Sequence, residues 1–300
     1  MAYDFENEID RVKKYYEGDS LQKRFSALIT GETNTGKTYL LRTARLPIHI
    51  DSFDPGGTKC LMANSKWSET DPRRFSSLYD RIDNPVGQIF ADTQWENEDP
   101  LQPKVFPEWK KSCDIRFRIK YFNHFATYCI DSATTFGNTV MNDVLNSKSR
   151  AGEVPQHRHD YNPQKVAMSN YISKLMNIPC DFFMTGHLKE IKKLIHMDTK
   201  TGVAHEEIKY RFYTTGQAVI TIPLLFDEIY VIIGKEQGQG REPKREMLID
   251  SLGTYIARSR LKAAGKLDAV EPPDIKTLLK KAGLSWGDKP FIGKEVNKNE

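Results

Sequence analysis

Residues 31–38 form a glycine-rich sequence whose residue types could hold a phosphate group. Their order is Gly31-Glu32-Thr33-Asn34-Thr35-Gly36-Lys37-Thr38, which satisfies the pattern GxxxxGK[ST] in full. The two glycines let the backbone turn tightly enough for its N–H groups to face a phosphate. Lys37 would supply a compact positive charge, and Thr38 would offer a hydroxyl to Mg²⁺. The pattern predicts a nucleotide-binding loop over these residues, continued by Tyr39.

A magnesium ion on such a loop needs an acidic residue at the end of a neighbouring strand. Asp131 is the best candidate, because it closes the apolar run 125–130 and is followed by Ser132. The alternative is an ordinary strand-end aspartate that caps the next helix. Residues 131–134 lack the DxxG pattern of GTPases, and the chain contains no NKxD. Serine also stands where many AAA+ and helicase ATPases have glutamate.

The surrounding elements are expected to alternate between strands and helices over residues 25–190, which predicts a parallel sheet with crossover helices. Strands are expected at 25–30, 47–51, 125–131 and 179–185, and helices at 39–44, 107–113, 134–146 and 163–177. Residues 188–216 are expected to form a β-hairpin with its turn at 198–202. The apolar, β-branched segments 218–222 and 226–233 are expected as further strands.

The chain divides by composition into one large core with shorter flanking segments. A helical lead-in is expected over 1–24, the core over 25–250, a helical region over 251–287 and a flexible tail over 288–300. Within the core, 58–120 is a variable insertion and 147–162 a polar, mobile loop.

Composition narrows the class of protein further. The chain has 300 residues, 39% of them hydrophobic, and a net charge of +4, which permits a polyanionic partner without requiring one. We expect no membrane partner, because no apolar run approaches the roughly 18 residues of a membrane span. The N-terminus does not resemble a secretory signal. The four cysteines are far apart, which argues against a zinc site or disulfides and fits the cytoplasm.

The order of these motifs resembles the RecA-like ATPases, in particular the nucleotide-binding "AAA domain" proteins of bacteriophages. It is a strand, the phosphate loop, a strand followed by Asp54-Pro55-Gly56-Gly57, a strand with Asp131-Ser132, and a strand ending in Thr185-Gly186-His187. Segments 226–231, 255–260 and 271–279 add to the resemblance, which spans residues 25–285.

The resemblance implies an α/β fold: a RecA-like P-loop NTPase whose mainly parallel sheet is flanked by helices and extended by antiparallel strands and a hairpin. It implies ATP and Mg²⁺, hydrolysis of a phosphoric anhydride, and a role in phage DNA recombination, annealing or replication in the host cell cytoplasm. Some members act with single-strand annealing or recombination functions. Such proteins usually work as homo-oligomeric rings or filaments.

The same resemblance suggests two further site residues. The carboxylate that activates water would follow the second strand, where Asp54, or less favourably Asp51, replaces the usual glutamate. Aspartate is one methylene shorter, so Asp54 is equally well explained as a turn former before Pro55. His187 fits the residue that senses the γ-phosphate, although a strand-end histidine is as often a plain surface residue.

Several basic residues occupy the places where RecA-like proteins put their DNA-binding loops. Single-stranded DNA would be bound there by charge and stacking; the candidates are Lys148, Arg150, Arg158, Lys189 and Lys192. The alternative is a set of solvated loops. Lys189 or Arg241 could act as a basic finger towards a neighbouring subunit. His157 and His159 lack a third residue spaced to bind a metal.

Three hypotheses follow from the sequence. The first is an ATPase coupled to DNA. The second is a nucleotide-dependent DNA-binding or assembly protein with little turnover, which the aspartate in place of glutamate favours. The third is a small-molecule P-loop kinase, for which Arg150 and Arg158 would supply the lid arginines.

Overall fold

The structure is a computed structural model that describes residues 8–13, 25–77, 85–156, 159–197, 204–214, 216, 218–235, 237–238 and 243–293. For residues 193–197 and 204–207 it describes the backbone alone. Residues 8–13 are helical, and the rest of the expected lead-in lies outside the described residues.

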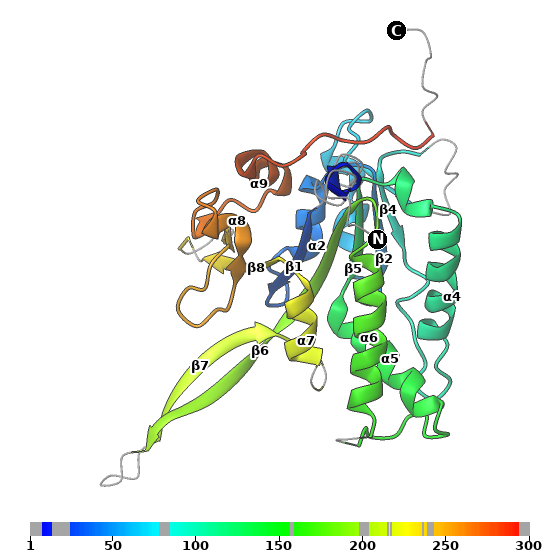
Figure 1. Ribbon diagram of the computed structural model, residues 1–300, viewed down its shortest axis with the longest axis vertical. Helices are drawn as coiled ribbons and strands as arrows, with labels where there is room; N and C mark the ends of the chain where they lie inside the picture. The colour runs from blue at the N-terminus through cyan, green and yellow to red at the C-terminus, as the bar shows by residue number, and fades with distance from the viewer. Residues whose placement is uncertain are drawn as a thin grey trace.

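A central, mainly parallel sheet organises the chain (Figure 1). Its parallel strands lie in the order β8-β1-β6-β5-β2-β4-β3. Their bounds are β1 Ser26–Gly31, β2 Ile48–Ser52, β3 Phe75–Ser77, β4 Ile89–Asp92, β5 Thr127–Asp131, β6 Asp181–Met197 and β8 Glu228–Lys235. Antiparallel strands extend it beyond β8: β9 (Lys244–Leu248), β10 (Arg258–Ser259) and β11 (Val270–Glu271).

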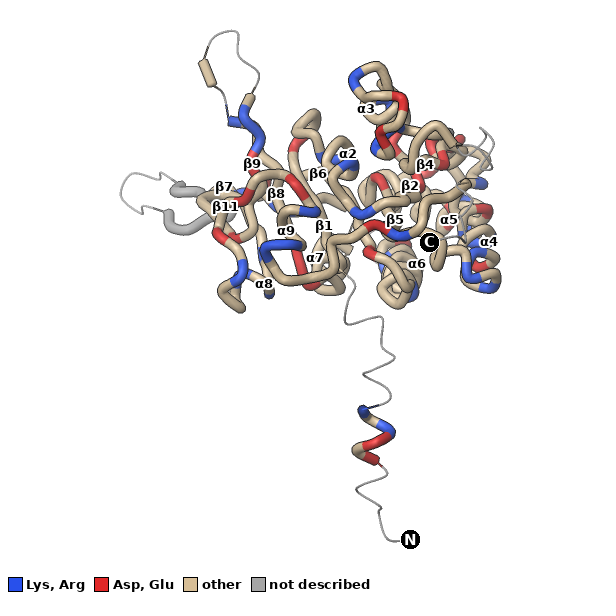
Figure 2. Tube along the Cα trace, turned by 90° about the horizontal axis from the view of Figure 1, so that it is seen from above, with Lys and Arg blue, Asp and Glu red and all other residues tan. Residues whose placement is uncertain are grey.

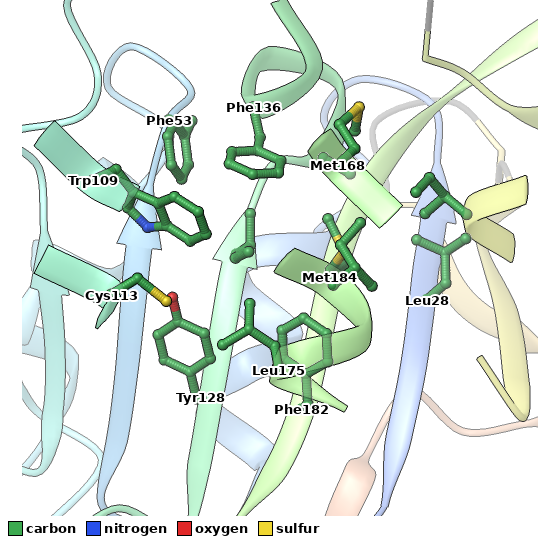
Figure 3. Packing of buried hydrophobic residues seen from close by; sticks show 14 of the residues in the cluster. Leu28, Phe53, Trp109, Cys113, Tyr128, Phe136, Met168, Leu175, Phe182 and Met184 are labelled. Carbon is green, nitrogen blue, oxygen red and sulfur yellow. The ribbon is translucent and has the colours of Figure 1, made fainter. Parts of the chain in front are cut away.

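Both faces of the sheet are buried, each in its own hydrophobic core. Successive side chains of a strand point to opposite faces, so neighbouring residues belong to different cores. Leu28 of β1 belongs to one core, whereas its neighbours Ala27 and Ile29 belong to the other. Helices α4 (Val105–Arg118), α5 (Ala133–Asn146), α6 (Tyr161–Leu175) and α7 (Ala218–Leu225) contribute to the core that contains Leu28. In that core Trp109 packs edge-on against Phe136, with ring centroids 4.9 Å apart (Figure 3).

Shorter helices contribute to the second core, which contains Ala27 and Ile29. They are α2 (Lys37–Leu40), the 3-10 turn η2 (Leu41–Thr43), α3 (Lys59–Met62), α8 (Arg260–Ala263) and α9 (Ile275–Ala282). Two further 3-10 turns, η3 (Asn64–Lys66) and η4 (Tyr121–His124), lie between strands. The α/β fold with a mainly parallel sheet, predicted from the sequence, is therefore confirmed.

The hairpin predicted for 188–216 is present as the end of β6 paired with β7 (Ala204–Phe212). It projects from the body of the molecule (Figure 1). Its register brings Leu188 opposite Phe212 and Lys189 opposite Arg211. The predicted turn at 198–202 lies outside the described residues.

The strand predicted at 218–222 is wrong, because this segment is helix α7. Apolar β-branched residues suit a buried strand, but here Ala218 and Ile222 form the buried side of a helix that packs on α6. Within 58–120, β3 and β4 lengthen the parallel sheet beyond β2. Residues 251–287, expected to be helical, contain β10 and β11 as well as α8 and α9.

Residues 288–293, expected to be part of a flexible tail, make specific contacts with the core. The Lys289 ammonium donates hydrogen bonds to the Phe125 and Pro179 carbonyls at 2.6 and 3.0 Å, and the Lys289 N–H donates to Leu46. These bonds tie the segment to the edge of the sheet where β5 and β6 begin. Among the described residues, no helix is both long and apolar enough to cross a membrane.

Candidate functional site

The phosphate loop joins the carboxyl end of β1 to α2 and has the tight backbone that its glycines predict. Asn34 and Gly36 have positive φ angles of 65° and 94°. A Cβ atom on Gly31 would lie 2.7 Å from the Ile232 carbonyl oxygen and 2.6 Å from Thr35 Oγ1, so only glycine fits there. Strand β8, which carries Ile232, thus supports the loop from the side.

Lys37 is buried beneath this loop with 7% of its surface exposed. Its Nζ donates to the Gly31 and Glu32 carbonyls at 3.1 and 2.8 Å. Burial lowers the pKa of Lys37, and the carboxylates of Asp131, Asp54 and Glu32 oppose that shift. The ammonium is therefore held in place by neutral acceptors, for which a phosphate would be a stronger, charged replacement.

Thr38 and Asp131 meet at the edge of the sheet, as the motif spacing predicts. Thr38 Oγ1 donates to Asp131 Oδ2 at 2.7 Å, and Thr185 Oγ1 donates to Asp131 Oδ1. Thr185 comes from β6, which lies between the strand of the loop and the strand of Asp131. Burial raises the pKa of Asp131, and the two threonine hydrogen bonds oppose that shift. A carboxylate beside a hydroxyl is a hard oxygen donor set that suits Mg²⁺.

Asp54 is held at the same edge by residues of the turn that begins α5. Its Oδ1 accepts hydrogen bonds from Ser132 Oγ at 2.8 Å and from Thr135 Oγ1, and its Oδ2 lies 3.3 Å from His187 Nε2. Burial alone would raise the pKa of Asp54, but the hydrogen bonds from His187, Thr135 and Ser132 outweigh it and lower the pKa. Asp54 is consequently an ionised acceptor, and sequence reasoning missed Thr135.

Glu96 fixes the segment that carries Asp54, a role that the sequence did not reveal. Its two carboxylate oxygens accept hydrogen bonds from Ser52 Oγ at 2.7 Å and from the Gly56 N–H at 2.8 Å. A Cβ atom on Gly57 would lie 3.0 Å from Asp54 Cβ, so a larger residue there would press on the carboxylate. The Asp-Pro-Gly-Gly turn is therefore a fixed support for Asp54.

Lys37, the Thr38–Asp131 pair and the Asp54–His187 pair border one cavity of about 710 Å³. It is lined by Thr33, Asn34, Gly36, Lys37, Thr38, Tyr39, Asp54, Gly56, Gly57, Cys60, Ala63, Lys66, Asp131, His187 and Arg245. A second cavity of about 600 Å³, bordered by Glu32, Thr134, Leu188 and Tyr213, shares Thr33 and His187 with the first. The two cavities meet where the phosphate loop faces the base of the hairpin.

Asp51, the alternative to Asp54, does not line this cavity. Its carboxylate is completely buried and accepts hydrogen bonds from Arg116, Trp109 and Tyr128. These partners come from α4 and β5, and none of them lines the cavity. The structure therefore places Asp51 in the core, and Asp54 is the acidic residue of this segment that lies at the site.

The basic residues suggested for DNA binding differ in whether acidic residues of the protein already pair with them. Lys148 and Arg150 both bind the buried Asp160, at 2.7 and 2.9 Å, so their charges are matched within the protein. The Lys189 ammonium lies 5.2 Å from the ring centroid of Tyr213 beside the second cavity, and Lys192 lies 3.9 Å from a Glu190 oxygen. Arg158, His157 and Arg241 lie outside the described residues.

The strand order, with a phosphate loop after β1 and one strand between it and the strand of Asp131, defines a RecA-like P-loop fold. No protein-family model and no curated protein matches the chain. Among solved structures, the chain is similar to a KaiC-like protein from the hyperthermophilic archaeon Pyrococcus horikoshii. That likeness has a TM-score of 0.40 and 13% identity and covers 76% of this chain and 80% of the other. The resemblance to phage proteins stays a prediction.

Proposed function

We propose that the chain binds Mg-ATP and hydrolyses its terminal phosphoanhydride bond. One observation carries the proposal: Lys37, the Thr38–Asp131 pair and the Asp54–His187 pair all border a single cavity large enough for a nucleotide. A phosphate loop alone would support binding, whereas an ionised carboxylate held across from it also supports the activation of water.

The residues divide the work between binding and positioning. The loop N–H groups and Lys37 would hold the phosphates, and Thr38 and Asp131 would hold Mg²⁺, which neutralises charge on the phosphates when it is bound. Asp54 would accept a hydrogen bond from the attacking water, and its low pKa suits orientation rather than strong basicity. His187, within 3.3 Å of Asp54, would report the state of the terminal phosphate to the hairpin that it begins.

Asp54→Asn is expected to lower the rate of ATP turnover by about 10²–10⁴-fold, the usual contribution of such a group. ATP affinity should remain within about twofold, because Asp54 touches neither the loop nor Lys37 directly. Phosphate release and equilibrium binding of ATP measure the two effects. Asp250→Asn is the matched control, because Asp250 forms a surface ion pair with Lys262 at 2.7 Å. Unchanged turnover in Asp54→Asn would remove this residue from the mechanism.

ATP is also expected to protect Cys60 from alkylation. Cys60 lines the cavity and is exposed, whereas Cys113, Cys129 and Cys180 are buried, so a thiol reagent should modify one cysteine of the native protein. Desolvation at the cavity wall and the nearby Asp131 carboxylate raise the pKa of the Cys60 thiol, so labelling is best followed at alkaline pH. Mass spectrometry should show a severalfold slower reaction with Mg-ATP than with Mg²⁺ alone. Equal rates would mean that the nucleotide does not enter this cavity.

We further propose that turnover is coupled to single-stranded DNA through the base of the hairpin. Lys189 lies two residues after His187 and next to the aromatic face of Tyr213, which is the pairing of charge and stacking that single strands need. Figure 2 shows Lys and Arg interspersed with Asp and Glu over the described chain. This mixture disfavours a broad basic surface for DNA and favours a local contact. Phosphate release measured with and without a single-stranded oligonucleotide tests the coupling.

A homo-oligomeric ring or filament is also part of the proposal. The molecular mass of the protein in solution with ATP tests it.

Nucleotide-dependent assembly with little turnover is the second candidate, favoured by aspartate in place of glutamate at position 54. Tight ATP binding without phosphate release would establish it. The kinase hypothesis is weakened, because Arg150 is bound to Asp160, Glu153 and the Val154 carbonyl and does not line the cavity.

A further inference from the structure

Arg245 lies against the phosphate loop although it is more than 200 residues away in the sequence. Its Cδ and Nε atoms are 3.2 Å, and its Cζ 3.4 Å, from the position that a Cβ of Gly36 would occupy. Strand β9, which begins with Lys244 and Arg245, pairs with β8, and β8 pairs with the loop strand β1 (Figure 2). The sheet therefore brings this arginine to the cavity within a single chain.

The guanidinium of Arg245 has no partner among the described residues, in contrast to the two lysines nearest to it on β8 and β9. Lys235 and Lys244 both bind Glu246, at 2.6 and 3.1 Å. Within the part of the chain that the structure describes, the Arg245 side chain has no hydrogen bond or ion pair. Its N–H donors, which match phosphate geometry, stand beside the residue that precedes Lys37.

We infer that Arg245 donates hydrogen bonds to the α- and β-phosphate oxygens of the nucleotide bound by its own chain. The inference rests on the proposed function and adds a binding residue to it. The backbone of a phosphate loop surrounds the α- and β-phosphates, whereas its lysine reaches the β- and γ-phosphates. An arginine beside Gly36 therefore faces the part of the nucleotide that ATP and ADP share.

This position predicts a particular kinetic signature. A contact that is equally strong before and during transfer of the γ-phosphate contributes to binding and not to the chemical step. Loss of Arg245 should raise KM and leave kcat nearly unchanged. If Arg245 instead stabilised the γ-phosphate during its transfer, loss of the side chain would lower kcat and leave the affinity for ADP unchanged.

Titration calorimetry with ATP and with ADP tests the inference on the wild-type chain and on Arg245→Ala, Arg245→Lys and Lys244→Ala. Arg245→Ala should weaken both nucleotides by the same factor, about tenfold or more for hydrogen bonds to a charged group. Arg245→Lys should fall between, because lysine keeps the charge without the paired donors. Lys244→Ala, one residue away on the same strand, should bind both nucleotides like the wild type.

Three results would overturn the inference. Unchanged affinities in Arg245→Ala would show that the side chain does not touch the nucleotide. A fall in kcat with normal ADP affinity would assign it to the γ-phosphate. Turnover restored by mixing Arg245→Ala with Lys37→Ala would show that the arginine serves a neighbouring chain. Because wild type and Lys244→Ala are measured alongside, failure of both to bind any nucleotide would instead refute the proposed function itself.

Discussion

Replacing Lys37 by alanine is expected to reduce ATP turnover by at least about a hundredfold and to weaken ATP binding strongly, as losses of charge-stabilising donors commonly do. The ammonium is enclosed by the loop, and burial already lowers its pKa, so the protein maintains a costly buried charge there. A phosphate is the partner that would offset this cost, because neutral carbonyls are weaker acceptors.

The same variant should fold normally. Among the described residues Lys37 Nζ donates to the Gly31 and Glu32 carbonyls alone. Hydrogen bonds of this kind contribute about 1 kcal/mol each, and relief of the buried charge offsets their loss. The melting temperature and phosphate release should therefore respond differently. Lys111→Ala on the exposed side of α4 is the matched control and should leave both unchanged. Full phosphate release by Lys37→Ala would end the ATPase proposal.

The parts of the site that could be predicted from the sequence depend on residues that are close together in the chain or that end a strand. Residues 31–38 form their loop through their own spacing, and the structure adds only the support of β8 behind Gly31. Asp131 could be found because strand ends meet at one edge of a parallel sheet, which places an acidic strand terminus near the loop. Its hydrogen bond to Thr38 has the geometry that this argument requires.

The parts that the sequence did not predict depend on which strands become neighbours. Glu96 supports the Asp54 segment from a residue 44 positions beyond Ser52, and Arg245 reaches the loop through two strand pairings. Neither residue belongs to a local pattern. Helix α7 could not be predicted for a different reason, since segment 218–222 is apolar apart from Thr221 and too short to show a period that separates helix from strand.

Asp51 shows how a candidate catalytic residue can be a structural one. It lies three residues before Asp54, near the end of the same apolar strand, so spacing alone favours neither strongly. In the fold its carboxylate accepts from Arg116 at 2.8 and 2.9 Å, from Trp109 Nε1 at 2.7 Å and from Tyr128 at 2.5 Å. Arg116 also binds Asp92 at 2.9 Å and so links β2, β4 and α4. The positively charged guanidinium of Arg116 lies between the carboxylates of Asp51 and Asp92. It would repel a metal ion bound there, so the nearby His49 is a poor candidate for a metal ligand.

Asp51→Asn is accordingly expected to lower the free energy of unfolding by about 3–5 kcal/mol, the usual cost of removing one partner of a buried ion pair. Arg116 would lose the charge that compensates its own burial. Denaturant unfolding measures the loss. Asp114→Asn, which breaks an exposed pair with Lys174 at 2.6 Å, should cost about 1 kcal/mol or less. Turnover per folded molecule should be unaffected by Asp51→Asn, in contrast to Asp54→Asn.

The pH dependence of that loss gives an independent check on the origin of the effect. Burial alone would raise the pKa of Asp51, but Arg116 and the hydrogen bonds from His49 and Tyr128 outweigh it, and the pKa is lowered well below its ordinary value. A carboxylate with a lowered pKa in the folded state stabilises the protein above the unfolded pKa of about 4 and loses that contribution as the pH falls further. The stability difference between wild type and Asp51→Asn should therefore be constant from about pH 5 to 8 and should shrink only below about pH 4. A difference that changed near neutral pH would mean that another group, and not this carboxylate, holds the network together.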